Sequence, residues 1–164
     1  MAKTEVAGNN GGVTCLWLSR HEPLLAQRRA LERHFPGCQW VMDSDIFVDA
    51  ADIVKRVDKA KNGAGSVEVV IVAPLSLIQK LIERGIKPLW PVMREVVSGA
   101  SSSTISQEKW FHKYSDSEVP RMVLEAAEYY RVHTDSCVLA PRGRVLEFVK
   151  FRRLVGIHME FEEL

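Results

Sequence analysis

The sequence predicts an α/β fold, a Rossmann-like, doubly wound and mainly parallel sheet. Strand-like and helix-like segments alternate with short connections as far as Val97. Two strand-like segments, Val13–Leu18 and Val67–Ala73, are almost wholly apolar, as strands are when helices cover both faces of a sheet. Polar residues follow the first of these directly, at the position where a parallel sheet presents a ligand crevice.

The composition is that of an ordinary globular protein. The chain has 164 residues, of which 46% are hydrophobic and 26% charged, and a net charge of +1 gives no support for attraction to duplex nucleic acid or an acidic membrane. Its apolar runs are far shorter than the ~20 residues of a membrane span. Three cysteines without a C-x-x-C pair indicate reduced thiols, and five histidines lack metal-ligand spacing. We therefore expect a cytoplasmic protein without a metal site or cofactor.

Four strands are expected before residue 98, and helices connect them. They are Val13–Leu18, Cys38–Met42, Val67–Ala73 and Pro88–Val97. Short right-handed crossovers favour a strand order beginning 2-1-3, which makes the first and third strands neighbours. The two prolines of the fourth strand predict a position away from the sheet centre.

The three helices between these strands have recognisable ends. Pro23 and Pro74 stand where a helix begins, and Asp49 is an N-cap residue. Glycines follow the last turns, where a left-handed residue is favoured. These glycines are Gly37, Gly63 and Gly85.

The pattern is less regular after residue 97. We expect a disordered tail at 1–12 and one Rossmann-like domain at 13–164, with a core at 13–97, a flexible loop at 98–106 and an extension at 107–164. Ser115-x-x-Glu118 resembles a capping box and predicts an additional helix. Val145–Phe151 and the strictly alternating Leu154–Phe161 predict a C-terminal antiparallel β-hairpin that turns near Arg152 and Arg153.

Ser19, Arg20 and His21 are the strongest candidates for a functional site, since they follow the first central strand. Ser19 and the next backbone amides are suited to hold a phosphate, and Arg20 to grip it with two hydrogen bonds. Histidine is the side chain best suited to move a proton near neutral pH, so His21 is a candidate for proton transfer. The alternative is that Arg20 and His21 pair with nearby carboxylates and only stabilise the loop.

Leu75 and Ser76 follow the third strand and are predicted to complete the site. If the first and third strands are neighbours, Ser76 and the first amides of its helix face the Ser19–His21 loop. The alternative is that Ser76 only caps the helix. Arg94, at the end of the fourth strand, is a further candidate for ligand binding, with an edge ion pair as its alternative.

Asp43 and Asp45 raise the question of a metal-binding or acid/base carboxylate pair. Two residues apart on an extended segment, the two carboxylates would point the same way. A solvated turn is the favoured interpretation, because the sequence offers no third metal ligand nearby.

Two motifs resemble those of a known family. Leu18-Ser19-Arg20-His21 ends one strand, and Val69–Ile78, containing Ala73-Pro74-Leu75, joins a later strand to a helix that closes in Glu83-Arg84-Gly85. Together they resemble the small single-domain CRISPR-associated ring nucleases, relatives of the CARF sensor domains. The resemblance covers about residues 13–95. Histidine phosphatases also place Arg-His after their first strand, but glycine follows there, whereas this chain has Glu22.

The resemblance implies a homodimer that binds cyclic oligoadenylate across its two-fold axis and cleaves it without a metal. Ser19 and Arg20 would hold the phosphate, His21 would be the acid or base, and Ser76 would complete the site. The alternative is a non-catalytic nucleotide-sensing or interaction module of a defence system or mobile element, which would use the 98–106 loop and the basic hairpin as its partner surface. A histidine-type phosphomonoesterase is the third alternative, which predicts phosphohistidine at His21.

Overall fold

The computed structural model of the chain describes residues 12–61, 65–97, 121–158 and 160–164. Several features predicted from the sequence lie outside these residues. They are the tail before residue 12, the helix end at Asn62-Gly63, the loop at 98–106, and the capping box of Ser115 and Glu118.

The described residues form two compact units. Unit 1 contains the residues up to Glu22, Leu31–Trp90 and Phe151–Leu164, and unit 2 contains Pro23–Ala30 and Pro91–Lys150. The candidate site lies within unit 1.

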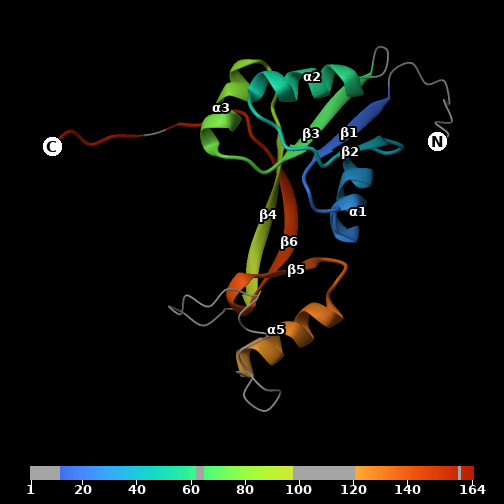
Figure 1. Cartoon of the computed structure of the whole chain (residues 1–164), viewed down its shortest axis with the longest axis vertical. Coiled ribbons are helices and arrows are strands. Elements are labelled where there is room, and N and C mark those ends of the chain that lie inside the picture. Colours follow the sequence, from blue (N-terminus) through green and yellow to red (C-terminus); the bar gives the residue numbers. More distant parts are fainter. Residues whose placement is uncertain (1–11, 62–64, 98–120, 159) are drawn as a thin grey trace. The chain divides into compact units, whose positions relative to one another are not determined.

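Six strands are hydrogen-bonded into one sheet in the order β2-β1-β3-β4-β6-β5 (Figure 1). β1 is parallel to both β2 and β3, β3 is parallel to β4, and β5 is antiparallel to β6. The predicted 2-1-3 order and the mainly parallel sheet are confirmed. The strands are β1 Val13–Leu18, β2 Gln39–Asp43, β3 Ser66–Ile71, β4 Leu89–Val97, β5 Cys137–Ala140 and β6 Arg144–Arg153.

The helices begin and end near the predicted residues. Asp49 caps α2, because its Oδ1 accepts a hydrogen bond from the Asp52 amide at 2.8 Å. Gly37 and Gly85, which follow α1 and α3, have φ angles of 72° and 82°, in the left-handed region that favours glycine. The helices are α1 Leu25–His34, α2 Ala50–Ala60, α3 Leu75–Glu83 and α5 Arg121–Val132.

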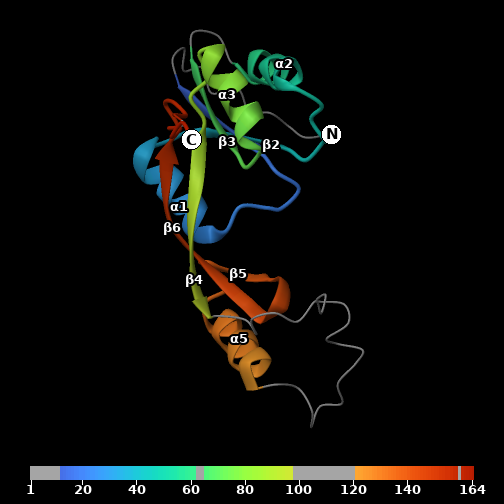
Figure 2. The same cartoon turned by 90° about the vertical axis from the view of Figure 1, so that its left-hand side faces the viewer.

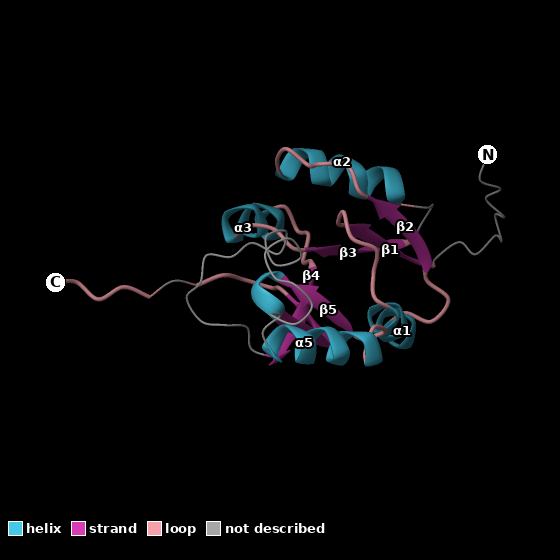
Figure 3. Ribbon diagram, turned by 60° about the horizontal axis from the view of Figure 1, so that its bottom comes forward, coloured by secondary structure: helices cyan, strands magenta, loops and turns pink. Residues whose placement is uncertain are grey.

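Both faces of β1 and β3 are buried in unit 1. Leu16 and Ile71 are in the core beneath α2 and α3, whereas Cys15 and Trp17 are in a second core with Leu31 of α1. Figure 3 shows α2 and α3 on one side of these strands and α1 on the other. Because successive residues of a strand point to opposite faces, helices on both faces require the continuous apolar run seen in the sequence.

The core of unit 2 lies between α5 and the β5–β6 hairpin (Figure 2). Ala126 of α5, Cys137 and Val145 are its buried residues. Beside them, the Glu147 carboxylate accepts hydrogen bonds from the Tyr129 hydroxyl at 3.1 Å and from Arg94 at 3.0 Å.

The predicted hairpin exists, but its location in the sequence was wrong. Its strands are β5 and β6 and its turn is Pro141–Gly143, so the turn is not at Arg152 and Arg153. The described residues of Leu154–Phe161 form no strand. This segment cannot pair with β6, because β6 already has β4 on one side and β5 on the other. The Leu154 amide instead donates to the Pro88 carbonyl at 2.9 Å.

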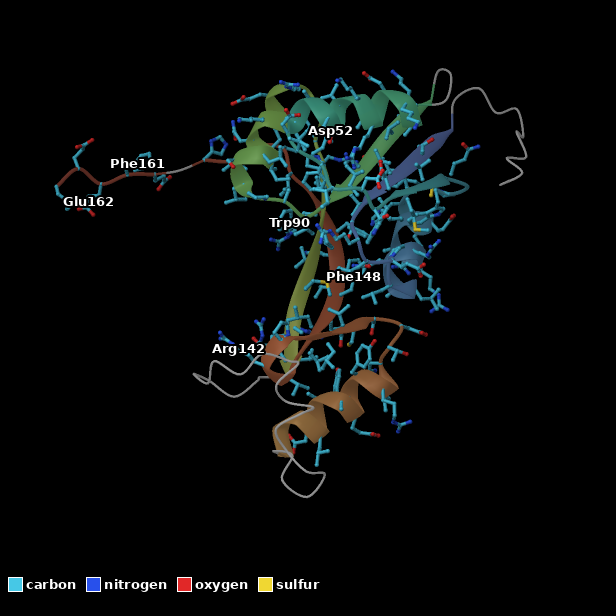
Figure 4. All side chains as sticks on the ribbon, in the orientation of Figure 1. Asp52, Trp90, Arg142, Phe148, Phe161 and Glu162 are labelled. Atoms are coloured by element: carbon cyan, nitrogen blue, oxygen red, sulfur yellow. The ribbon has the colours of Figure 1, made fainter. Side chains whose placement is uncertain are left out.

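The stretch after β6 is only partly packed. Leu154 and Ile157 contact the core beneath α2 and α3, whereas the Phe161 side chain is 83% exposed on an extended segment (Figure 4). Arg153, at the end of β6, pairs with Glu68 of β3 at 2.7 Å.

The prediction that β4 lies away from the sheet centre was also wrong, because β4 lies between β3 and β6. Its registered pairing with β3 is Leu89 opposite Val70. Pro91 comes after that pair, so the missing proline N–H does not interrupt it.

None of the helices in the described residues combines the length and the apolar character that crossing a bilayer requires.

Candidate functional site

A cavity of about 330 Å³ opens in unit 1 at the carboxyl ends of β1, β2 and β3. Loops that follow three neighbouring parallel strands contribute to it, as expected for a ligand crevice in an α/β sheet. Its lining residues are Leu18, Ser19, Arg20, His21, Ser44, Asp45, Ile46, Phe47 and Val72.

The loop after β1 is held by two hydrogen bonds to its backbone. The Ser19 Oγ accepts from the His21 amide at 3.2 Å, and the Trp17 indole Nε1 donates to the His21 carbonyl at 2.8 Å. The His21 amide is therefore already satisfied within the loop. The sequence predicted that backbone amides after Ser19 bind phosphate, but the His21 amide already donates to Ser19 and is not available to a ligand.

The side chains of Arg20 and His21 are exposed and line the cavity. Among the described residues, neither side chain forms an ion pair or a hydrogen bond. The alternative that they pair with nearby carboxylates is therefore not seen in this part of the chain. A cationic group and an imidazole at one cavity wall are suited to bind an anion.

Arg56 of α2 holds the loop after β2. Its Nη1 donates to the Asp45 carbonyl and its Nη2 to the Ile46 carbonyl, both at 2.8 Å. Nη1 also lies 3.4 Å from the Asp43 Oδ1. The Arg56 side chain is only 13% exposed, so these contacts are partly shielded from water.

Asp52, one turn before Arg56 on α2, fixes the guanidinium. Arg56 Nε and Nη2 donate to the two carboxylate oxygens of Asp52 at 3.2 Å and 3.0 Å. The hydrogen bond from Arg56 lowers the pKa of the Asp52 carboxyl below its ordinary value. Asp52 Oδ2 also accepts from the Val48 amide at 3.1 Å, which ties the end of the loop to the same pair.

Sequence reasoning did not identify Arg56 as a residue of the site. The available signal was the i, i+4 spacing of Asp52 and Arg56, which places oppositely charged side chains on one helix face. That spacing does not reveal which loop the guanidinium would also hold.

Asp43 and Asp45 form the turn that the sequence favoured. The Asp43 Oδ1 accepts from the Asp45 amide at 3.0 Å and faces Arg56, so Asp43 is committed to the loop. The Asp45 side chain is exposed and lines the cavity. The described residues contain no cluster of three or more metal-ligating side chains.

The other predicted site residues lie elsewhere. Val72 is the residue that the β3–α3 connection contributes to the cavity, while Leu75, which is 62% exposed, and Ser76 do not line it. Ser76 is also not the cap of α3, because Pro74 occupies that position without a side-chain hydrogen bond. Arg94 belongs to unit 2, where it forms its ion pair with Glu147.

The cavity therefore combines three kinds of chemistry. Arg20 and His21 are suited to an anion, Ser44 and Asp45 offer hydrogen-bonding oxygens, and the side chains of Ile46 and Phe47 are apolar. A ligand that fits has an anionic group, hydroxyl or other donor groups, and an apolar face. Comparison of the chain with protein-family models, curated proteins and solved structures finds no match.

Proposed function

We propose that the cavity binds a phosphodiester unit of a cyclic oligoadenylate and that the protein opens this ring as a metal-independent ring nuclease. The observation that carries the proposal is the position of Ser19, Arg20 and His21 on one cavity wall at the carboxyl end of β1. Helices cover both faces of β1 and β3, which supports a Rossmann-like, doubly wound sheet. In such a sheet, ligands bind at the carboxyl ends of the strands.

Arg20 is the principal phosphate-binding residue in this proposal. Its guanidinium can donate two parallel hydrogen bonds to phosphate oxygens, a charge-assisted geometry. The Ser19 Oγ already accepts from the His21 amide, which leaves its O–H free to donate to the same phosphate. Both groups are suited to stabilise charge on the phosphate oxygens in the transition state.

The size of the cavity supports binding of part of a ring. At about 330 Å³ it is at the lower end of the range of ~300–1,000 Å³ for small-molecule sites. A symmetric ring would therefore use the cavities of two copies related by a two-fold axis. Ile46 and Val72, which are 69% and 59% exposed, provide the apolar surface that an adenine or a second copy would cover.

The proposed reaction is an internal transesterification. The ribose 2′-oxygen attacks the adjacent phosphorus, the bond from phosphorus to the 5′-oxygen breaks, and a linear product with a 2′,3′-cyclic phosphate forms. His21 either accepts the proton of the 2′-hydroxyl or donates one to the departing 5′-oxygen. The remaining contribution is positioning of the 2′-oxygen in line with the leaving group.

A non-catalytic nucleotide-sensing module is the second candidate, and one observation favours it. No hydrogen bond from the described residues orients the exposed His21 imidazole. In catalytic sites the second ring nitrogen of a histidine is commonly held by another group. A module of this kind would bind the same ligand through Arg20 without cleaving it.

Product analysis separates the candidates. The protein is incubated with cyclic tetra-adenylate and a chelator, and bound and cleaved nucleotide are resolved by chromatography. His21→Gln is compared with His34→Gln, which changes an exposed histidine at the end of α1. The ring nuclease predicts a linear product, a rate ~10²–10⁴-fold lower for His21→Gln, and an unchanged rate for His34→Gln.

The other outcomes overturn one candidate, both candidates, or the role of His21. Bound but intact ring overturns the nuclease and supports the sensing module. A ring that is neither bound nor cleaved overturns both. Cleavage by His21→Gln at the wild-type rate removes His21 from the proton transfer.

A further inference from the structure

Two opposite charges line the candidate cavity without pairing. Arg20 lies on the loop after β1 and Asp45 on the loop after β2. Among the described residues, no ion pair joins these two side chains or joins either of them to another residue. A ligand between them meets a cation at one position and a carboxylate at another.

The backbone of Asp45 is fixed at both of its peptide groups. Its amide donates to the Asp43 Oδ1 at 3.0 Å, and its carbonyl accepts from Arg56 Nη1 at 2.8 Å. Arg56 also binds the next carbonyl, that of Ile46, at 2.8 Å. The loop thus presents the Asp45 carboxylate at the cavity while using none of its oxygens for its own structure.

A carboxylate in this position selects hydrogen-bond donors and repels anions. It accepts hydrogen bonds from hydroxyl groups, and its charge disfavours a second phosphate at the same position. The phosphate is therefore directed to Arg20, and the group that contacts Asp45 is a neutral donor. In a nucleotide, the donors next to the phosphate are the ribose hydroxyls.

We propose that Asp45 accepts a hydrogen bond from a ribose 2′-hydroxyl of the bound ligand other than the attacking one, and so selects ribonucleotides over deoxyribonucleotides. This inference rests on the proposed function. Asp45 is a specificity-determining residue here, and Arg56 is the positioning residue that holds its loop. A deoxyribose leaves the Asp45 carboxylate without its partner, which we expect to weaken binding about 10-fold or more.

The test compares the dissociation constants of cyclic tetra-adenylate and of its all-2′-deoxy analogue. Binding is followed by tryptophan fluorescence after rapid mixing, before any cleavage. The readout is the dissociation constant of the all-2′-deoxy analogue divided by that of cyclic tetra-adenylate. A ratio is used because removing a negative charge tightens the binding of both phosphate-containing ligands together. Asp45→Ala is compared with Asp58→Ala, which removes an exposed carboxylate of α2 that forms no ion pair or hydrogen bond with another described residue.

The expected result is a ratio of about 10 or more for the wild type and for Asp58→Ala, and a ratio near 1 for Asp45→Ala. Equal binding of both ligands by the wild type overturns the role of Asp45 while the proposed function stands. A wild-type ratio that persists in Asp45→Ala overturns it as well. Binding of neither ligand overturns both proposals.

Discussion

The indole Nε1 of Trp17 donates a hydrogen bond to the carbonyl oxygen of His21 at 2.8 Å. Trp17 is a core residue of β1, with 5% of its surface exposed, whereas the His21 side chain is exposed at the cavity. The bond therefore ties the candidate ligand-binding loop directly to the sheet. A loop fixed in this way orders the groups that bind a ligand before the ligand arrives.

Trp17→Phe should loosen this loop and lower stability. Phenylalanine keeps an aromatic ring in the core but leaves the partly buried His21 carbonyl without its donor. We expect the free energy of unfolding to fall by about 1–3 kcal/mol. Urea denaturation measures the change. Trp40→Phe is the control, because its indole makes a longer, exposed 3.4 Å hydrogen bond to Glu32. Equal losses in the two variants would refute the structural role of the Trp17 bond.

Arg56→Lys should release the loop after β2. A lysine ammonium cannot hold two carbonyls and the paired oxygens of Asp52 together as the planar guanidinium does. We expect a loss of about 2 kcal/mol in the free energy of unfolding and faster proteolysis within Ser44–Val48. Arg131→Lys is the control, since Arg131 pairs with Glu128 at the surface, where an exposed ion pair contributes little to stability. If both variants match the wild type, Arg56 does not hold the loop.

Stability should depend on pH through the buried thiols. Burial raises the pKa of Cys15 and of Cys38 above the ordinary value of 9.0. The folded protein therefore keeps protons that the unfolded chain releases above about pH 9. The thiol contribution to stability is complete below that pH. It is lost as the pH rises from there toward the raised pKa of each folded thiol.

Denaturation of the wild type and of Cys15→Ala across this pH range measures the effect. The comparison removes the contributions of other groups that titrate at alkaline pH. We expect a shallower decline for Cys15→Ala. Parallel curves would mean that the Cys15 thiol ionises equally in the folded and unfolded states.

Arg142→Asn should stabilise the protein. Arg142 has φ 66° in the turn between β5 and β6 (Figure 4), a left-handed conformation that asparagine adopts more readily than arginine. We expect a gain of up to about 1 kcal/mol in the free energy of unfolding. Arg144→Asn should have the opposite sign, because Arg144 has φ −79° and begins a strand, where asparagine is unfavourable. A loss of stability in Arg142→Asn would contradict this account.

The local signals in the sequence were sufficient for the parallel part of the sheet. Continuous apolar runs predicted β1 and β3, since both faces of these strands are buried. Asp49 and Gly85 marked helix ends because capping and positive φ depend on residues close in the chain. The loop Ser19–His21 was predictable as part of a cavity for the same reason, as it directly follows β1.

The remaining features depend on contacts between distant residues. The alternation of Leu154–Phe161 favoured a strand paired with β6, but β6 already has β4 on one side and β5 on the other. β5 has only four residues, too few for a clear periodic signal. Arg56 binds the carbonyls of Asp45 and Ile46, which lie eleven and ten residues before it in the chain. No sequence pattern predicts that an arginine on a helix turns toward such a loop.

We propose above that the cavity wall of Ser19, Arg20 and His21 binds a phosphodiester. The most direct test is to measure the equilibrium binding of cyclic tetra-adenylate to two variants, Arg20→Gln and Arg33→Gln. Both substitutions remove one exposed positive charge from unit 1, but Arg33 lies in the last turn of α1 and does not line the cavity. We expect Arg20→Gln to weaken binding by about 10-fold or more and Arg33→Gln to bind as the wild type does. Equal affinity of the two variants, or no binding by the wild type, would contradict it.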